Sequence, residues 1–275
     1  MIQRYINACV FALLWLPVSA LAHGDLHLQI EDATKLIEKE PRKPELYLKR
    51  GELHRAHQDW DAAQADYDRA GALDRNMAVL DLVRGKLFLE ANWPLSAVVA
   101  LDRFLAVHTN HVDALVTRAR ALVKLERRLD AVNDYTRAIA SAAQPQPEMF
   151  LERAHALENE GEAYVEQALK GLDEGMTRLG PLVVLQQNAI EMEVKQKHFD
   201  AALTRVDRAT AAAPRKETWL ERRGDILQQA GRSKEAGEAY QAALNALATL
   251  PPSRRQVPAI IDMEQRLRNA VGKSQ

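Results

Sequence analysis

An arginine recurs along this chain at a spacing of about 34 residues, and a row of arginines could bind anions. Two acidic residues argue for another role, because Asp66 follows Arg50 at the same spacing at which Asp134 follows Arg118. At such a separation Arg and Asp can pair between adjacent helices through two parallel hydrogen bonds. We therefore expect structural ion pairs and not a ladder of ligand contacts. The recurring arginines are Arg50, Arg84, Arg118, Arg153 and Arg223.

Histidine is the second type of side chain here that could do chemistry. His23 and His27 lie one helical turn apart, and His23 would carry a free amine if the chain were processed just before it. Imidazole suits copper and zinc, so these two residues form a candidate metal site and suggest an alternative function in metal handling. No acidic or sulfur cluster beside them completes a coordination shell.

Enzyme signatures are missing from the sequence. It contains no H-E-x-x-H, G-x-S-x-G or G-x-G-x-x-G motif, the patterns of zinc proteases, serine hydrolases and dinucleotide-binding proteins. Gly272-Lys273-Ser274 imitates the end of a phosphate-binding loop, but the upstream glycine of that motif is absent. We expect a protein that is not an enzyme and that binds no cofactor.

Short helices must position these side chains. Residues 45–74 show two amphipathic segments joined by a tight turn, and the pattern returns twice more at an interval of about 34 residues. Small residues such as Gly51 and Ala63 stand where helices approach closely, and large ones such as Tyr67 fill the gaps. One helix pair cannot bury its apolar face alone, so several pairs must stack.

These repeated residues resemble the tetratricopeptide repeat family over roughly residues 44–247. The resemblance implies an all-α, right-handed superhelical solenoid of about six helix–turn–helix repeats, and it specifies the fold better than the partner. The second repeat departs from the pattern at Asp81, Pro94 and Phe104. The matching residues in the first, third and last repeats are Tyr47, Gly51, Ala63, Tyr67 and Ala70; Leu115, Ala119, Leu122, Ala131, Tyr135 and Ala138; and Leu220, Gly224, Leu227, Gly231, Ala236, Tyr240 and Ala243.

Proline, glycine and the repeat spacing divide the chain into segments. We expect an N-terminal capping helix within residues 23–43 and a linker and helix within 251–275. The last helix either docks on the final repeat through Ile261, Leu267 and Val271, or is mobile and binds elsewhere. The predicted repeats are 44–77, 78–111, 112–145, 147–180, 181–213 and 217–250.

Residues 1–22 have the pattern of a secretory signal peptide. Arg4 is followed by an apolar run over residues 6–16 and by Ala20-Leu21-Ala22, a cleavage-site pattern. We expect export to a bacterial periplasm, with general secretion as the alternative, and no stable membrane insertion after cleavage. An uncleaved anchor is less favoured, because the apolar stretch is barely long enough to span a bilayer. Cleavage would also remove Cys9, the only cysteine.

The charge of the chain is balanced. Its formal net charge is −1, and residues of both signs are interspersed. A nucleic-acid-binding protein usually carries a basic stripe or patch, and none is present in this sequence. We therefore expect no nucleic-acid partner.

By the resemblance, the outward side chains of each first helix line a concave groove that binds a protein or peptide partner. In the second repeat these positions are apolar at Leu82, Val83 and Leu89, and an exposed apolar patch flanked by charge is typical of a partner site. If the register slips in this irregular repeat, the same residues belong to the core. We expect a periplasmic adaptor or scaffold. The candidate partner-binding residues are Lys49, Glu52, Leu82, Val83, Lys86, Leu89, Val116, Arg120, Lys124, Glu152 and His155.

Overall fold

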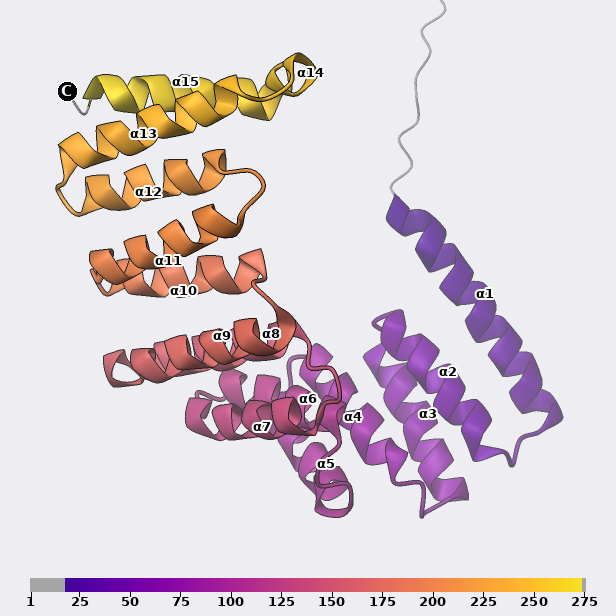
Figure 1. The fold of residues 1–275 in the computed structure, drawn as a ribbon. Helices are drawn as coiled ribbons and strands as arrows, with labels where there is room; N and C mark the ends of the chain where they lie inside the picture. The colour runs from indigo at the N-terminus through magenta and orange to yellow at the C-terminus, as the bar shows by residue number, and fades with distance from the viewer. Residues whose placement is uncertain (1–17, 274–275) are drawn as a thin grey trace, which may run out of the picture. The chain divides into compact units, whose positions relative to one another are not determined.

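The computed structural model describes residues 18–273, with side chains from Asp25 onward, and within this range every regular element is a helix (Figure 1). The predicted all-α repeat fold is confirmed. The helices are α1 (Val18–Lys39), α2 (Pro44–Ala56), α3 (Trp60–Leu73), α4 (Val79–Glu90), α5 (Pro94–Val107), α6 (Val112–Lys124), α7 (Arg128–Ser141), α8 (Pro147–Glu160), the short 3-10 helix η1 (Glu162–Tyr164), α9 (Val165–Leu179), α10 (Val183–Lys195), α11 (Phe199–Ala212), α12 (Glu217–Gln229), α13 (Ser233–Ala248), α14 (Pro252–Arg255) and α15 (Pro258–Lys273).

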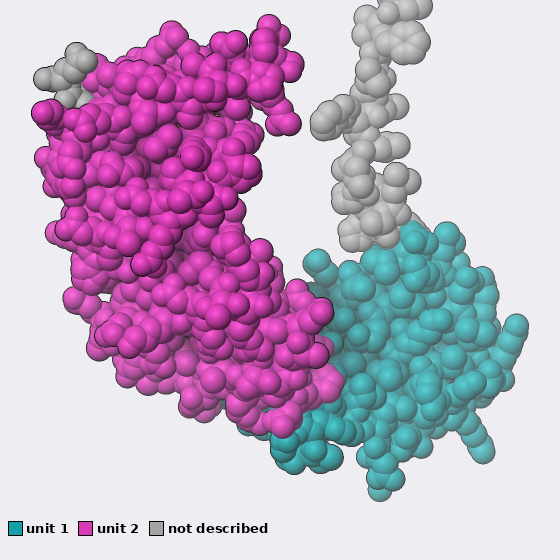
Figure 2. Space-filling view, in the orientation of Figure 1, with its two compact units in different colours: residues 1–109 teal, residues 110–275 magenta. Residues whose placement is uncertain are grey.

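The chain forms two compact units, Met1–Thr109 and Asn110–Gln275, which are coloured separately in Figure 2. In the N-terminal unit, α2 pairs with α3 and α4 pairs with α5. In the C-terminal unit, the pairs are α6–α7, α8–α9, α10–α11 and α12–α13. Within residues 18–273 the structure therefore contains six antiparallel helix pairs.

The core of the N-terminal unit explains the small residues of the first repeat. Tyr67 of α3 is fully buried, and a methyl group added at Gly51 of α2 would lie 2.6 Å from its Cε1 atom. Glycine is therefore required for α2 and α3 to approach this closely. α1 packs on α2 as a cap and buries Ala33 and Ile37. It passes through the predicted cleavage site after Ala22, and residues 1–17 of the predicted signal peptide lie outside the described residues.

The C-terminal unit is a stack in which α15 covers the last helix pair (Figure 1). Met263 and Leu267 of α15 are buried in a cluster with Tyr240 and Leu247 of α13. The last helix therefore docks on the final repeat. The predicted contact face needs one correction, because Ile261 is 52% exposed while Met263, one helical turn before Leu267, takes the buried position.

The fourth repeat contains an insertion that delays its second helix. Gly161 ends α8 with a φ of 143°, and η1 follows before α9 begins at Val165. The packing positions of α9 consequently fall later than in the other repeats. Gly175 is one of them, and a methyl group there would lie 2.9 Å from Cγ of Phe150.

The turns between paired helices share one backbone feature. A residue in the left-handed region follows the first helix of each pair. Apart from the residue in the fourth repeat, successive residues are separated by one repeat length within the first three repeats, and again between the fifth and sixth repeats. A left-handed residue just after a helix lets backbone N–H groups bond to its last carbonyls. The residues are Gln58 (φ 65°), Asn92 (62°) and Glu126 (60°), then Lys197 (59°) and Gly231 (75°).

Candidate functional site

The first and third repeats contain the predicted Arg–Asp pairs. Arg50 donates from Nε and Nη2 to Asp66 at 2.8 and 2.7 Å, and Arg118 makes the same two bonds to Asp134 at 2.7 Å each. Both aspartates are buried, with 4% and 3% exposure. The prediction of structural pairs is confirmed at these four residues, which tie the two helices of one repeat together.

The remaining arginines of the series also contact acidic residues in neighbouring helices. Arg84 and Arg223 reach back to Asp68 and Asp207 on the second helix of the preceding repeat. Arg153 is buried and donates to Glu174 at 2.6 Å. Each guanidinium thus binds a carboxylate of the protein itself, and none of the contacts forms a row open to a ligand.

Charged residues predicted for the groove are largely engaged within their own compact unit. Glu52 accepts from Arg55 at 3.0 Å and from the hydroxyl of Tyr67. Arg120 donates to Glu152 at 2.8 Å. The other charged or titratable positions differ in burial: Lys49, Lys124 and His155 are exposed, with Nδ1 of His155 3.5 Å from Glu158, and Lys86 is half-buried.

The apolar residues predicted for the groove are mostly covered. Leu82, Val83 and Val116 are only 7, 6 and 7% exposed, and Leu89 is half-buried. Val83 belongs to the core cluster that contains Tyr67 and Leu87. The expectation of an exposed apolar patch is therefore wrong for Leu82 and Val83, which are as buried as core residues. This agrees with the alternative that the register slips in the irregular second repeat.

Successive first helices are joined by ion pairs. Each pair connects the first helix of one repeat to that of the next repeat, or to α15 at the end of the stack. Such half-exposed pairs contribute little stability individually, but each holds its long side chains in place along the helix face. The pairs are Arg55–Glu90, Arg120–Glu152, Lys195–Glu158, Arg222–Glu191 and Arg266–Glu221.

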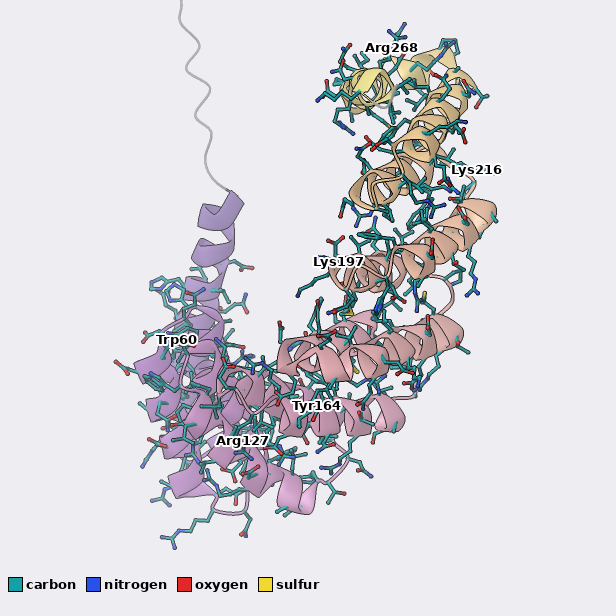
Figure 3. The ribbon with its side chains drawn as sticks, turned by 90° about the vertical axis from the view of Figure 1, so that its left-hand side faces the viewer. Trp60, Arg127, Tyr164, Lys197, Lys216 and Arg268 are labelled. Carbon is teal, nitrogen blue, oxygen red and sulfur yellow. The ribbon has the colours of Figure 1, made fainter. Side chains whose placement is uncertain are left out.

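A pocket of about 430 Å³ lies between α10 and α12 in the C-terminal unit. Gln187 and Thr218, both exposed, face it from the two helices, and Trp219 forms part of its apolar surface. In the stick view, Lys197 and Lys216 lie at opposite edges of this part of the stack (Figure 3). A pocket of this volume with a few polar groups is typical of a site for a small molecule or a short peptide segment.

Among the acidic residues that line this pocket, Asp225 has a neutral hydrogen-bond donor as its partner. It accepts a hydrogen bond of 3.0 Å from the hydroxyl of Tyr240. Burial of the phenol, followed by the negative charge of Asp225, raises the pKa of Tyr240 well above its usual range. The phenol therefore stays protonated at neutral pH and donates a hydrogen bond without neutralising the carboxylate.

The sequence predictions missed this pocket because they concentrated on the first four repeats. A usable signal was present, since Gln186, Gln187 and Asn188 form a polar run in the first helix of the fifth repeat. The side chain of Thr218 lies on the matching face of the first helix in the sixth repeat. Only the stacking of α10 on the α11–α12 layer brings these side chains to one place.

Of the two histidines in the predicted N-terminal metal site, the structure describes the side chain of His27 only. His27 is exposed and its Nε2 lies 3.5 Å from Glu31, while the side chain of His23 lies outside the described part of the chain. Among the described side chains, no group of three His, Cys, Asp or Glu residues could hold a metal ion. Within residues 18–273, no helix combines the length and apolarity needed to cross a membrane.

Comparison with known proteins agrees with the repeat geometry. Residues 182–260, which contain α10 to α13 and therefore the pocket, match the family model of a tetratricopeptide repeat-like domain. The chain has the tetratricopeptide repeat fold. No curated protein matches its sequence.

Several solved tetratricopeptide repeat structures resemble this one. A protein from Parabacteroides merdae is 15% identical with a TM-score of 0.54, and the match covers 91% of this chain and 95% of that one. PilF of Pseudomonas aeruginosa is 16% identical with a TM-score of 0.52, covering 72% and 88%. MamA from Desulfovibrio magneticus is 14% identical with a TM-score of 0.51, covering 58% and 88%. At these identities the likeness establishes the fold alone.

Proposed function

We propose that this tetratricopeptide repeat protein is a non-enzymatic adaptor that holds a segment of a partner protein on the first-helix face of its C-terminal unit. The observation that carries the proposal is the pocket of about 430 Å³ between α10 and α12. The volume falls in the range of ligand sites, and the pocket combines apolar surface with hydrogen-bonding groups. A partner would therefore be held by side chains of two consecutive repeats.

The pocket differs from the rest of the first-helix face in having uncommitted polar groups. Among the described residues, the side chains of Gln187 and Thr218 form no hydrogen bond or ion pair. Elsewhere on this face, Arg120 and Glu152 are paired with each other. A partner that bound there would have to displace an existing ion pair, whereas Gln187 and Thr218 offer donors and acceptors that no described group of the chain engages.

The residues predicted for the groove remain candidate contacts, each within its own compact unit. In the N-terminal unit the accessible ones are Lys49, Glu52 and Lys86. In the C-terminal unit they are Arg120, Lys124, Glu152 and His155. They would extend the contact along the first helices of their unit and do not by themselves define a pocket.

Site-specific photo-cross-linking tests the adaptor function. A photoreactive amino acid at Thr218 should capture a specific protein in the native cell envelope, and the same group at the exposed Lys234 of α13 should not. Filling the pocket with Gln187→Trp should remove the Thr218 cross-link, while Glu238→Trp, an exposed substitution outside the pocket, should leave it. Equal capture from Thr218 and Lys234 would contradict the proposal.

We also propose that the protein works in the periplasm after removal of residues 1–22. The support is the Arg4, apolar-run and Ala20-Leu21-Ala22 pattern. N-terminal sequencing of the protein from cell envelopes should start at His23, and the variant Ala20→Leu/Ala22→Leu should retain the leader. An N-terminus at Met1 in the native protein would contradict this assignment.

A further inference from the structure

We infer that the pocket between α10 and α12 selects a cationic side chain, a lysine or an arginine of the bound segment, through the carboxylate of Asp225. The inference rests on the proposed function and names the chemistry of the partner at this site.

The charges of the pocket leave one carboxylate without a cation. Glu191 is paired with Arg222, and Glu221 accepts from Arg266 at 3.1 Å. Asp225 differs, because the hydroxyl of Tyr240 is its one hydrogen-bond partner among the described residues. A neutral hydroxyl leaves the full negative charge of Asp225 in a partly buried place, where charge-assisted hydrogen bonds are stronger than neutral ones.

The same charges disfavour an anionic ligand. A carboxylate or phosphate would meet Glu191, Glu221 and Asp225, and the one lining cation, Arg222, already binds Glu191. Like charges brought together in a partly desolvated site cost free energy, whereas a cation would be attracted to Asp225. This arrangement of charges therefore favours a cationic ligand over an anionic one.

The neutral lining suits the rest of a peptide segment. Gln187, Asn188 and Thr218 can hydrogen-bond to a peptide backbone, and Nδ2 of Asn188 already donates to the carbonyl of Val184, which leaves its oxygen free to accept. Trp219, which is 7% exposed, provides apolar surface for the methylene stem of a lysine or arginine. A volume of about 430 Å³ accommodates a short segment and not a folded domain.

Capped pentapeptides provide a direct test on the full chain. The probes are Ac-Ser-Gly-Xaa-Gly-Ser-NH₂ with Arg, Lys, Gln or Glu at the centre, so that only the central side chain carries charge. Binding is followed by NMR through the indole signal of Trp219 and the side-chain amide signals of Gln187 and Asn188. The Arg and Lys peptides should shift these signals at concentrations at least about tenfold lower than the Gln peptide, as expected for a hydrogen bond to a charged group.

The variant Asp225→Asn should remove this preference, because the amide oxygen still accepts from Tyr240 while the charge is gone. Glu238→Gln, which removes an exposed charge on α13 outside the pocket, should preserve it. If Asp225→Asn does not fold, the Arg-over-Gln preference of the unaltered chain should still weaken as salt is raised, because salt screens the attraction.

Two outcomes would overturn the inference and are distinguishable. Equal affinities of the Arg and Gln peptides for the pocket would refute cation selection and leave segment binding in place. If the Arg peptide moves none of the pocket signals, the assignment of a cationic ligand fails, and cross-linking from Thr218 reports separately on whether a partner binds at all.

Discussion

Arg118 holds Asp134 through two hydrogen bonds of 2.7 Å, from Nε to Oδ2 and from Nη2 to Oδ1, across the turn between α6 and α7. The side chain of Asp134 is 4% exposed and that of Arg118 is 18% exposed. A carboxylate this deeply buried needs its guanidinium partner, because an isolated buried charge is strongly disfavoured. The pair therefore specifies how the two helices of the third repeat meet.

Removing one partner of this pair should destabilise the protein. Asp134→Ala removes the buried carboxylate that accepts two hydrogen bonds from Arg118, and we expect a loss of about 3 kcal/mol in the free energy of unfolding. Urea unfolding followed by circular dichroism measures the loss. The double variant Arg118→Met/Asp134→Leu should recover much of it, since apolar replacement of a buried pair is often tolerated.

The matched control for this prediction is an exposed ion pair. Glu166 and Lys170 of α9 lie 2.8 Å apart with both side chains largely in solvent. Glu166→Ala should leave the unfolding midpoint unchanged, because exposed pairs contribute little. An unchanged midpoint in Asp134→Ala as well would show that the buried pair has no structural role.

The close approach of α2 and α3 predicts a second effect. Gly51→Ala places a methyl group 2.6 Å from Cε1 of the fully buried Tyr67, so the ring or the helix must shift. We expect destabilisation by about 1–3 kcal/mol, the usual result of overpacking a core. Gly272→Ala, where the added methyl group meets open space, is the control and should not lower the thermal midpoint.

The left-handed turn residues predict opposite changes in stability when glycine is introduced at one turn and removed from another. Lys197 adopts a φ of 59° after α10, and Gly231 adopts a φ of 75° at the equivalent place in the next repeat. Lys197→Gly should stabilise the protein by about 0.5 kcal/mol, and Gly231→Ala should destabilise it by about 1 kcal/mol, because only glycine adopts this conformation without steric cost.

Chemical denaturation of the two single variants measures both effects. Gly180→Ala, at a φ of 88° between α9 and α10, gives a third left-handed position for comparison and should behave like Gly231→Ala. Stabilities that change in the same direction for Lys197→Gly and Gly231→Ala would contradict the backbone explanation.

Three buried tyrosines predict a stability limit at alkaline pH. Burial, followed by the neighbouring carboxylate, raises the pKa of Tyr67 beside Glu52 and of Tyr240 beside Asp225, and burial with Glu152 does the same for Tyr135. A raised pKa favours the protonated phenol in the folded state. The associated stability is fully present below the ordinary tyrosine pKa of about 10 and is lost as the pH rises above it.

Absorbance of tyrosinate near 295 nm checks this prediction during an alkaline titration. Tyr67, Tyr135 and Tyr240 should ionise only together with the loss of helicity, and Tyr67→Phe should reduce the late amplitude. Full ionisation of all tyrosines in a chain that keeps its helical circular dichroism would contradict the buried assignment.

Much of the architecture followed from local patterns in the chain. The stretch from Arg50 to Asp66 contains the end of one helix, a tight turn and the first part of the next helix. Because that geometry is set by short-range backbone hydrogen bonds, the pairing of these two side chains could be predicted from their spacing.

The groove was harder to predict because exposure depends on neighbouring repeats. Leu82 and Val83 occupy positions that face outward in a regular repeat, yet they are buried in the irregular second one. The buried face of the last helix could not be predicted for the same reason. Ile261 and Met263 each lie on an apolar face of this helix, and either face could pack against the neighbouring helix. Only the packing of α15 on α13 decides between them.

The amino-acid sequence by itself determined the repeat period, the helix pairs and the Arg–Asp contacts within a repeat, because all of these depend on interactions between residues near each other in the chain. The tertiary structure alone decided which face of α15 is buried and that a pocket opens between α10 and α12. It also decided that Asp225 meets a phenol and not a cation. These features depend on how neighbouring helices pack, and local sequence preference does not specify that packing.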